Sequence, residues 1–285
     1  MLATASGYTS PSEQPLTHRR DWWWAFPLLT LIVYLGFVVY ATYRVLEPWI
    51  AGAAVAEYAG YYFADNGNYH YLSPMGTPDL TFLVPGILHT LPVVGLMLHS
   101  PAAVILPFPA LFRFTCYYYR KSYYRAFTAR PYACAVPAAV PGGSYKGERG
   151  LLVVQNVHRY FLYAAIVITV FLLYDALRSI FTPNGLYFGF GSAFMLVNVA
   201  FLMLYTFGCH SFRHLVGGKL DVFSCDPLAR WRYGWWSKVT TLNDRHALWA
   251  WLSLLTVWGV DVYIRYVVMP LQAQGVTHLF GVIPL

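Results

Sequence analysis

Two short stretches of the sequence carry a cysteine and an arginine at the same spacing, followed by a further basic residue or histidine. They read FTCYYYRK at residues 114–121 and FGCHSFRH at residues 207–214, and each ends a long apolar run. A second cysteine follows in both cases, Cys134 after 18 residues and Cys225 after 16. Cysteines repeated at matched positions make metal binding the first chemistry to consider.

A histidine follows each cysteine pair, at the start of the next apolar run. His158 lies in VQNVHRYF and His246 in TLNDRHALWAW, with an asparagine shortly before each. The second cysteine and the histidine are 24 residues apart in the first copy and 21 in the second. Parallel repeats related by an axis along the membrane normal occur in membrane folds. Such an axis would place Cys116 opposite Cys209, and His158 opposite His246.

The apolar runs identify the class of protein. Hydrophobic residues make up 58% of the 285-residue chain and charged residues only 11%, whereas a soluble domain has about 25% charged residues. Five runs approach or exceed the length that crosses a bilayer, at 22–43, 80–112, 160–174, 186–208 and 247–268. We therefore predict an all-α integral membrane protein with five transmembrane helices, in which helices 2–3 and 4–5 form a pseudo-two-fold repeat.

Lysine and arginine alternate between the segments that join these runs. They are concentrated before the first run, between the second and third, and between the fourth and fifth, whereas Arg44 and Arg178 stand alone in the other two segments. Basic loops stay in the cytoplasm, so we expect a multi-pass protein of the cell inner (plasma) membrane with a cytoplasmic N-terminus. The expected divisions are a cytoplasmic segment 1–21, a membrane anchor domain 22–270 and an outer tail 271–285. This topology accounts for the net charge of +7 without nucleic acid.

Two kinds of centre use two cysteines and two histidines. Zinc binds such a set tetrahedrally in structural sites, and a Rieske [2Fe–2S] cluster has two cysteines on one iron and two histidines on the other. The symmetry of the repeat favours the cluster. All four cysteines fall on the predicted cytoplasmic side, where thiols stay reduced. The preferred ligands are Cys116, His158, Cys209 and His246, with Cys134 and Cys225 as the alternative cysteine pair. Taken singly, each cysteine could equally be a buried packing residue.

Four stretches together resemble one protein family. FRFTCYYYRKSYYRAF, VQNVHRYF, CHSFRHLVGGKLD and LNDRHALWAWLSL are similar to the membrane anchor of an actinobacterial, mycobacterial-type succinate dehydrogenase, complex II of the respiratory chain, over roughly residues 20–270. The resemblance implies a flavoprotein subunit with FAD that oxidises succinate, and an iron–sulfur subunit that passes the electrons on. This anchor would deliver them to a quinone, either menaquinone or ubiquinone. The chain would then hold no catalytic residue for succinate, and it contains no G-x-G-x-x-G fingerprint.

Haem b is the alternative cofactor in this family. Many five-span anchors carry two b haems on histidines from their first four spans, but the run 22–43 contains no histidine. The two-haem arrangement therefore does not transfer, and some similar members hold a membrane-embedded Rieske-type cluster instead. The histidines left for haem are His89, His99, His158, His210 and His246.

Quinone reduction needs an apolar slot with polar groups that hold the carbonyls and supply protons. The candidates near the predicted centre are Tyr119, Arg120, His210, Arg213, His214 and Trp249. His210 and His214 also share one helix face at i, i+4, a spacing that suits metal binding. The basic, aromatic segments predict a surface on which an iron–sulfur partner docks. Rival interpretations are a transporter gated by the proline-broken second run, and a zinc-stabilised membrane scaffold.

Overall fold

The computed structural model describes residues 22, 24–51, 63–65, 70–77, 102–120, 122, 149–182, 185–218, 220–275 and 283–284. Within them, four helices are long and apolar enough to cross a membrane: Ala25–Glu47, Asn156–Arg178, Phe190–Phe207 and His246–Ala273. They correspond to the first, third, fourth and fifth predicted spans. Most of the second, 80–112, lies outside the described residues, and its end belongs to a shorter apolar helix, Ala102–Thr115. The chain is thus a mostly helical, multi-span membrane protein.

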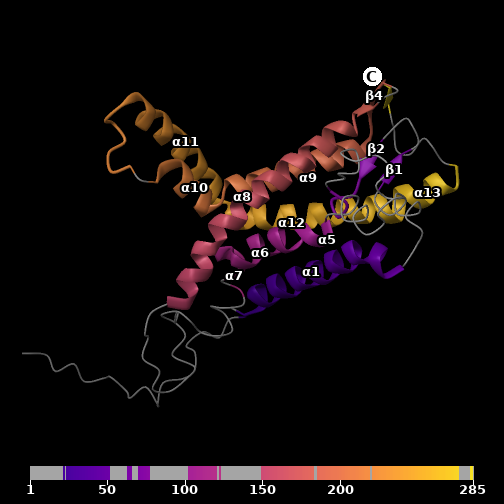
Figure 1. The fold of residues 1–285 in the computed structure, drawn as a ribbon, viewed down its shortest axis with the longest axis horizontal. Helices are drawn as coiled ribbons and strands as arrows, with labels where there is room; N and C mark the ends of the chain where they lie inside the picture. Colours follow the sequence, from indigo (N-terminus) through magenta and orange to yellow (C-terminus); the bar gives the residue numbers. More distant parts are fainter. Residues whose placement is uncertain are drawn as a thin grey trace, which may run out of the picture.

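The long helices run side by side as an elongated bundle (Figure 1). It consists of α1 (Ala25–Ala51), α8 (Arg149–Arg178), α9 (Phe190–Phe207) and α12 (His246–Tyr263), which continues through a π-helical turn, η4 (Ile264–Val268), into α13 (Met269–Ala273). The α9–α12 pair packs most extensively, and Thr256 donates a 3.2 Å hydrogen bond to the buried side chain of Asn198 there. Interhelical polar contacts of this kind join helices in lipid.

The described end of the second predicted run, together with the residues that follow it, forms an interrupted helix. It consists of α5 (Ala102–Ile105), α6 (Pro107–Thr115) and α7 (Tyr117–Arg120), with breaks at Leu106 and Cys116. Pro107 occupies the start of α6, where its missing N–H leaves no hydrogen bond unmade. The segment packs against α8, and the Tyr34 hydroxyl of α1 donates a 2.9 Å hydrogen bond to Ala110 O.

A helical hairpin projects from one end of the bundle, which we call the hairpin end (Figure 1). Its helices are α10 (His210–Gly217) and α11 (Pro227–Asp244). Asp226 caps α11 by accepting a 2.7 Å hydrogen bond from the Ala229 amide, and this bond lowers the pKa of the Asp226 carboxyl. Arg232 donates to the carbonyls of Val216 and Gly218, both at 2.8 Å, so α11 is fixed to the end of α10.

Short strands cover the opposite end, the strand end. β1 (Phe63–Asp65) pairs antiparallel with β2 (His70–Leu72), and β4 (Gly185–Phe188) lies between β3 (Phe181–Thr182) and β5 (Ile283–Pro284). The ring of Tyr71 rests on Gly191 at the start of α9, where a Cβ atom would lie only 2.4 Å from it. A glycine is therefore required for the first sheet to approach the bundle.

A buried ionic network lies near the strand end. Arg44 Nε of α1 donates to Asp261 Oδ2 of α12 at 3.0 Å, and neither side chain is exposed to solvent. The hydroxyls of Tyr40 and Ser73 also donate to the Asp261 carboxylate, and Glu47 accepts from Arg44 and Arg265. Asp261 is therefore a structural partner of α1. Asp175 of α8, another buried acid, accepts from Thr77 Oγ1 at 2.8 Å.

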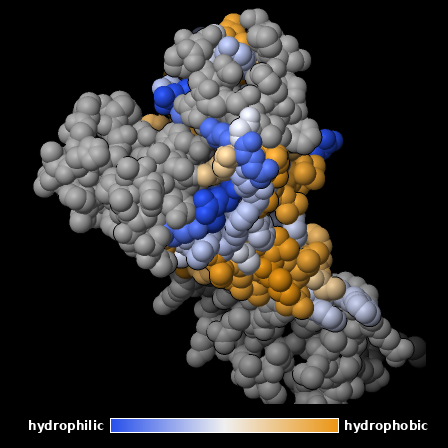
Figure 2. Space-filling model, turned by 90° about the vertical axis from the view of Figure 1, so that its right-hand side faces the viewer, coloured by the Kyte–Doolittle hydropathy of each residue, from blue (hydrophilic) through white to orange (hydrophobic). Residues whose placement is uncertain are grey.

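The outer faces of the bundle are apolar. Phe26, Ile32 and Val39 of α1 are each more than half exposed, as expected for side chains that face lipid. Seen from the strand end, hydrophobic residues cover much of the described surface beside a strip of hydrophilic ones (Figure 2). Inside, one hydrophobic cluster at the hairpin end includes Cys116 and Cys209, which places both thiols in the packed interior.

Candidate metal centre

Both inner cysteines interrupt a helix in the same way. Cys116 follows α6 with φ −60° and ψ 133°, and Cys209 follows α9 with φ −68° and ψ 142°. In each case the cysteine carbonyl accepts the amide of the fourth residue onward, Arg120 at 2.8 Å and Arg213 at 3.0 Å. The FxCxxxR motif therefore has one local structure in both places.

The four preferred ligands meet at the hairpin end. His158 Nε2 lies 3.0 Å from Cys209 Sγ, and His246 Nε2 lies 3.4 Å from Cys116 Sγ. All four line one cavity of about 520 Å³, which we call the Cys–His cavity. The closest contacts differ from the predicted pairing of like residues, because each thiol forms a hydrogen bond with an imidazole. The two-fold repeat of whole helices stays a prediction.

The two imidazoles are held by neighbouring side chains. Thr115 Oγ1 lies 2.8 Å from His158 Nδ1, and the Phe112 ring stacks on His158 with centroids 4.6 Å apart and planes 2° from parallel. Tyr205 stacks on His246 at 4.9 Å and 15°. Hydrogen bonding at the second nitrogen fixes the tautomer of a metal-binding histidine, so His158 is oriented with Nε2 towards the cavity. His246 Nδ1 is buried without a hydrogen-bond partner among the described residues.

The asparagine before His246 has a clear structural role. Asn243 Nδ2 donates a 2.8 Å hydrogen bond to Gly208 O, which joins the end of α11 to the end of α9. A Cβ atom on Gly208 would lie 2.6 Å from Leu204 O and 3.3 Å from Leu242 O. The first contact lies within the end of α9 itself, so this helix end needs glycine, and the contact with α11 would have to widen slightly for any larger residue.

The donor set fits a binuclear centre. Among the described residues, no three His, Cys, Asp or Glu side chains are placed to hold one metal ion; the four donors instead approach as two Cys–His pairs. A Rieske-type [2Fe–2S] cluster takes two cysteines on one iron and two histidines on the other. The number and kinds of donor match this set, and both thiol–imidazole contacts would have to open for the cluster to bind.

The alternative cysteine pair is not assembled in the described structure. Cys225 is exposed in the loop before α11, where its thiol donates to Asp226 Oδ2 at 3.2 Å. This hydrogen bond raises the pKa of the Cys225 thiol, which disfavours the thiolate that binds metals. Cys134, and the alternative haem ligands His89 and His99, lie outside the described residues.

The six predicted quinone residues do not gather in one place. Tyr119 is buried, with its hydroxyl donating to Ala250 O at 2.9 Å, and Arg120 is buried on α7. Trp249 donates to Leu242 O, and the Arg213 guanidinium lies 4.4 Å from the Trp236 ring centre. His210 alone of the six lines the Cys–His cavity. Its Nε2 lies 3.1 Å from that of His214, and burial followed by the charge of His214 lowers the pKa of His210.

Sequence reasoning missed Arg113, which it counted as a loop charge. Arg113 lies in the last turn of α6 and its side chain is buried. It donates to the Tyr119 hydroxyl, the Ala250 carbonyl and Ser253 Oγ at 3.0, 3.1 and 2.9 Å. These partners are neutral, so a positive charge is kept in the apolar interior. An arginine inside an apolar run, three residues before the repeated cysteine, was the available signal.

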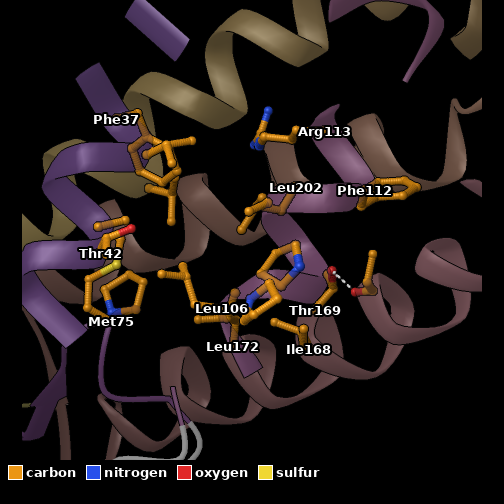
Figure 3. Close-up of a pocket in the computed structure, with 18 of the residues that line it drawn as sticks. Phe37, Thr42, Met75, Leu106, Phe112, Arg113, Ile168, Thr169, Leu172 and Leu202 are labelled. Atoms are coloured by element: carbon orange, nitrogen blue, oxygen red, sulfur yellow. Dashed lines mark hydrogen bonds between the residues drawn. The ribbon is translucent and has the colours of Figure 1, made fainter. Parts of the chain in front are cut away.

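Figure 3 shows the lining of a second cavity, which lies between the long helices. This apolar cavity of about 350 Å³ is enclosed by α1, α5, α6, α8, α9 and α12. Leu202 and Leu172 contribute to its wall, and Arg113 lies at its edge (Figure 3). Phe112 and Tyr205 belong to this wall as well as to the stacks on His158 and His246. Two aromatic rings thus separate the apolar cavity from the Cys–His cavity.

The fold is a helical membrane bundle, and cysteines and histidines gather at one end of it. These two features assign the chain to the class of multi-pass membrane proteins with a candidate redox centre. The family model of the actinobacterial succinate dehydrogenase subunit SdhC matches residues 25–270, and the chain belongs to this family. It is therefore a subunit of succinate dehydrogenase, an enzyme complex. One solved structure, that of the Mycobacterium smegmatis Sdh1 complex in the apo form, has a chain that is 38% identical, with a TM-score of 0.72. The alignment covers 99% of this chain and 100% of that one. A comparison with curated proteins found no match.

Proposed function

We propose that this subunit passes electrons from an iron–sulfur partner subunit to a quinone through a Rieske-type [2Fe–2S] cluster. The observation that carries the proposal is the meeting of Cys116, His158, Cys209 and His246, from four separate segments, at 3.0 and 3.4 Å around one cavity. Bound there, such a cluster would carry one electron at a time. Its imidazole ligands raise the reduction potential above that of all-cysteine ferredoxins, which suits transfer to a quinone.

Each surrounding residue has a definite task in this proposal. Thr115 orients His158, and Asn243 holds the segment that presents His246. Phe112 and Tyr205 close the site on its membrane side and exclude water. The buried charge of Arg113 favours the reduced forms of the groups around it, because electron transfer adds negative charge next to a cation.

The apolar cavity is the proposed position of the quinone ring. Its volume of about 350 Å³ falls in the range of about 300–1,000 Å³ typical of small-molecule sites. Phe112 and Tyr205 line it and touch the ligand histidines, so the ring would lie directly behind the cluster. Tyr119, from the predicted quinone set, is connected to this wall through Arg113. The other predicted quinone residues lie at the hairpin end and do not line this cavity.

The iron–sulfur subunit is proposed to dock at the hairpin end, with the flavoprotein subunit beyond it. The positive-inside pattern places this end in the cytoplasm. Arg230, Trp231, Trp235 and Lys238 are all exposed on α11. Exposed arginine and aromatic side chains are enriched at protein interfaces.

The test is to purify the subunit with its partners, reduce it with succinate, and record EPR and visible spectra with iron and zinc analysis. The proposal expects a [2Fe–2S] signal beyond those of the partner subunits. That signal should disappear in Cys116→Ala and Cys209→Ala and remain in Cys225→Ala. Haem b absorption bands without the extra signal would establish the haem alternative instead. Zinc without iron would establish the scaffold.

A further inference from the structure

The second candidate site is the histidine pair on α10. His210 and His214 follow one another on the same face, with ring centroids 4.6 Å apart and planes at 86°. Their Nε2 atoms are 3.1 Å apart, and both side chains are exposed. The two nitrogens are therefore close enough for one ion to reach both. Only His210 borders the Cys–His cavity, so such an ion would lie at the edge of the proposed cluster site and outside it.

We propose that His210 and His214 together bind one divalent transition-metal ion of the zinc class. Zinc–imidazole bonds are about 2.0–2.1 Å long. With the nitrogens 3.1 Å apart, bonds of this length give an N–metal–N angle of about 95–100°. This value lies between the octahedral and tetrahedral angles, so the separation of the two nitrogens is compatible with one shared ion. Imidazole suits zinc, copper and nickel and is a poor ligand for magnesium or calcium.

The surroundings define an open and exchangeable site. Among the described residues, no third His, Cys, Asp or Glu completes a group for one ion, so water would fill the remaining positions. Arg213 lies between the two histidines in sequence, but its guanidinium rests on the Trp236 ring at 4.4 Å. Asp244 lines the same cavity as His210 and adds negative charge nearby. An ion held here would lie at the edge of the Cys–His cavity, which His210 and His246 both line.

The experiment is a zinc titration of the purified complex after chelator treatment, with bound zinc counted by atomic absorption and affinity measured by calorimetry. His210→Gln and His214→Gln should each lose one zinc equivalent, and their affinity should fall by more than the 10–100-fold that an indirect ligand partner is worth. Cys225→Ala is the matched control, because it removes the exposed thiol of the same hairpin and should bind zinc as the wild type does.

Iron content and complex assembly are recorded for every variant. His210 is next to Cys209, so His210→Gln could also disturb that cysteine. His214 does not line the Cys–His cavity, and His214→Gln therefore decides the outcome. Unchanged zinc binding in His214→Gln, or loss of the site in Cys225→Ala, would overturn the proposal. A wild-type complex that holds zinc here and lacks the extra [2Fe–2S] signal would refute the proposed electron path and leave the zinc site standing.

Discussion

The guanidinium carbon of Arg113 lies 4.6 Å from the centre of the Tyr205 ring, and Tyr205 stacks on the imidazole of His246. One aromatic ring therefore separates a buried cation from a proposed cluster ligand. In the described part of the chain Arg113 forms no salt bridge, and its hydrogen bonds go to neutral oxygens. Because no carboxylate neutralises it, this positive charge stabilises the reduced form of a neighbouring redox group and so raises the reduction potential of that group.

The first prediction concerns this charge. Arg113→Gln should lower the midpoint potential of the proposed cluster, because removal of a nearby cation stabilises the oxidised form. Arg113→Lys keeps the charge and should shift the potential less. The measurement is a redox titration followed by EPR on the assembled complex. An unshifted potential in Arg113→Gln, with the cluster signal intact, would show that the charge has no electrostatic role.

The second prediction tests the orientation of His158. Thr115→Val removes the hydroxyl 2.8 Å from His158 Nδ1 and leaves the shape of the side chain unchanged. Loss of a hydrogen bond behind a metal-binding histidine costs about 10–100-fold in metal affinity, so the variant should release iron to a chelator at a lower chelator concentration. Thr115→Ser, which restores the hydroxyl, should behave as the wild type. Equal iron retention in all three proteins would contradict the proposed role.

The third prediction concerns the ion pair near the strand end. Arg44→Met leaves the buried Asp261 carboxylate without its cation, which should cost about 3–5 kcal/mol of stability. Asp261→Leu should have a comparable effect. The double variant removes both charges and should be clearly more stable than the sum of the two losses predicts. Thermal unfolding in detergent measures all four proteins, and additive losses would mean that the two residues are not coupled.

The fourth prediction compares two glycines in apolar helices. A Cβ atom at Gly191 would lie 2.4 Å from the buried Tyr71 ring, whereas at Gly36 the nearest atom is 3.8 Å away, on Trp258. Gly191→Ala should therefore displace β2 and cost about 1–3 kcal/mol, the usual penalty for overpacking. Gly36→Ala should be neutral or stabilising. Protease protection of the β1–β2 segment provides the measurement, and equal protection in both variants would contradict the close packing of Tyr71.

Much of the helical framework could be predicted from the sequence, because lipid requires long apolar helices whatever their neighbours are. The helices α1, α8, α9 and α12 coincide with four of the predicted runs. The repeated motif singled out the four residues that line the Cys–His cavity, but it paired like with like, whereas the closest contacts join Cys209 to His158 and Cys116 to His246. Their role as metal ligands stays a prediction.

Other features depend on tertiary contacts that no local pattern contains. Arg113 resembled a loop charge, because its burial depends on partners in α7 and α12 that sequence spacing does not reveal. The surface hairpin was treated as a basic loop, although Asp226 and Pro227 form a typical helix start. The predicted quinone residues were chosen for chemistry near the cysteines, and their side chains point in different directions because α7, α10 and α12 meet there.

The pairing of Arg44 with Asp261 also bears on how the protein is made. The two residues are 217 positions apart, so the ribosome releases the arginine long before its carboxylate exists. Throughout that interval Glu47, three residues further along α1, is the carboxylate that the same helix offers to Arg44. Closure of the Arg44–Asp261 pair, together with the Ser73 contact, then depends on arrival of the last helix. The ion pair between α1 and α12 can therefore form only after both helices have been inserted side by side.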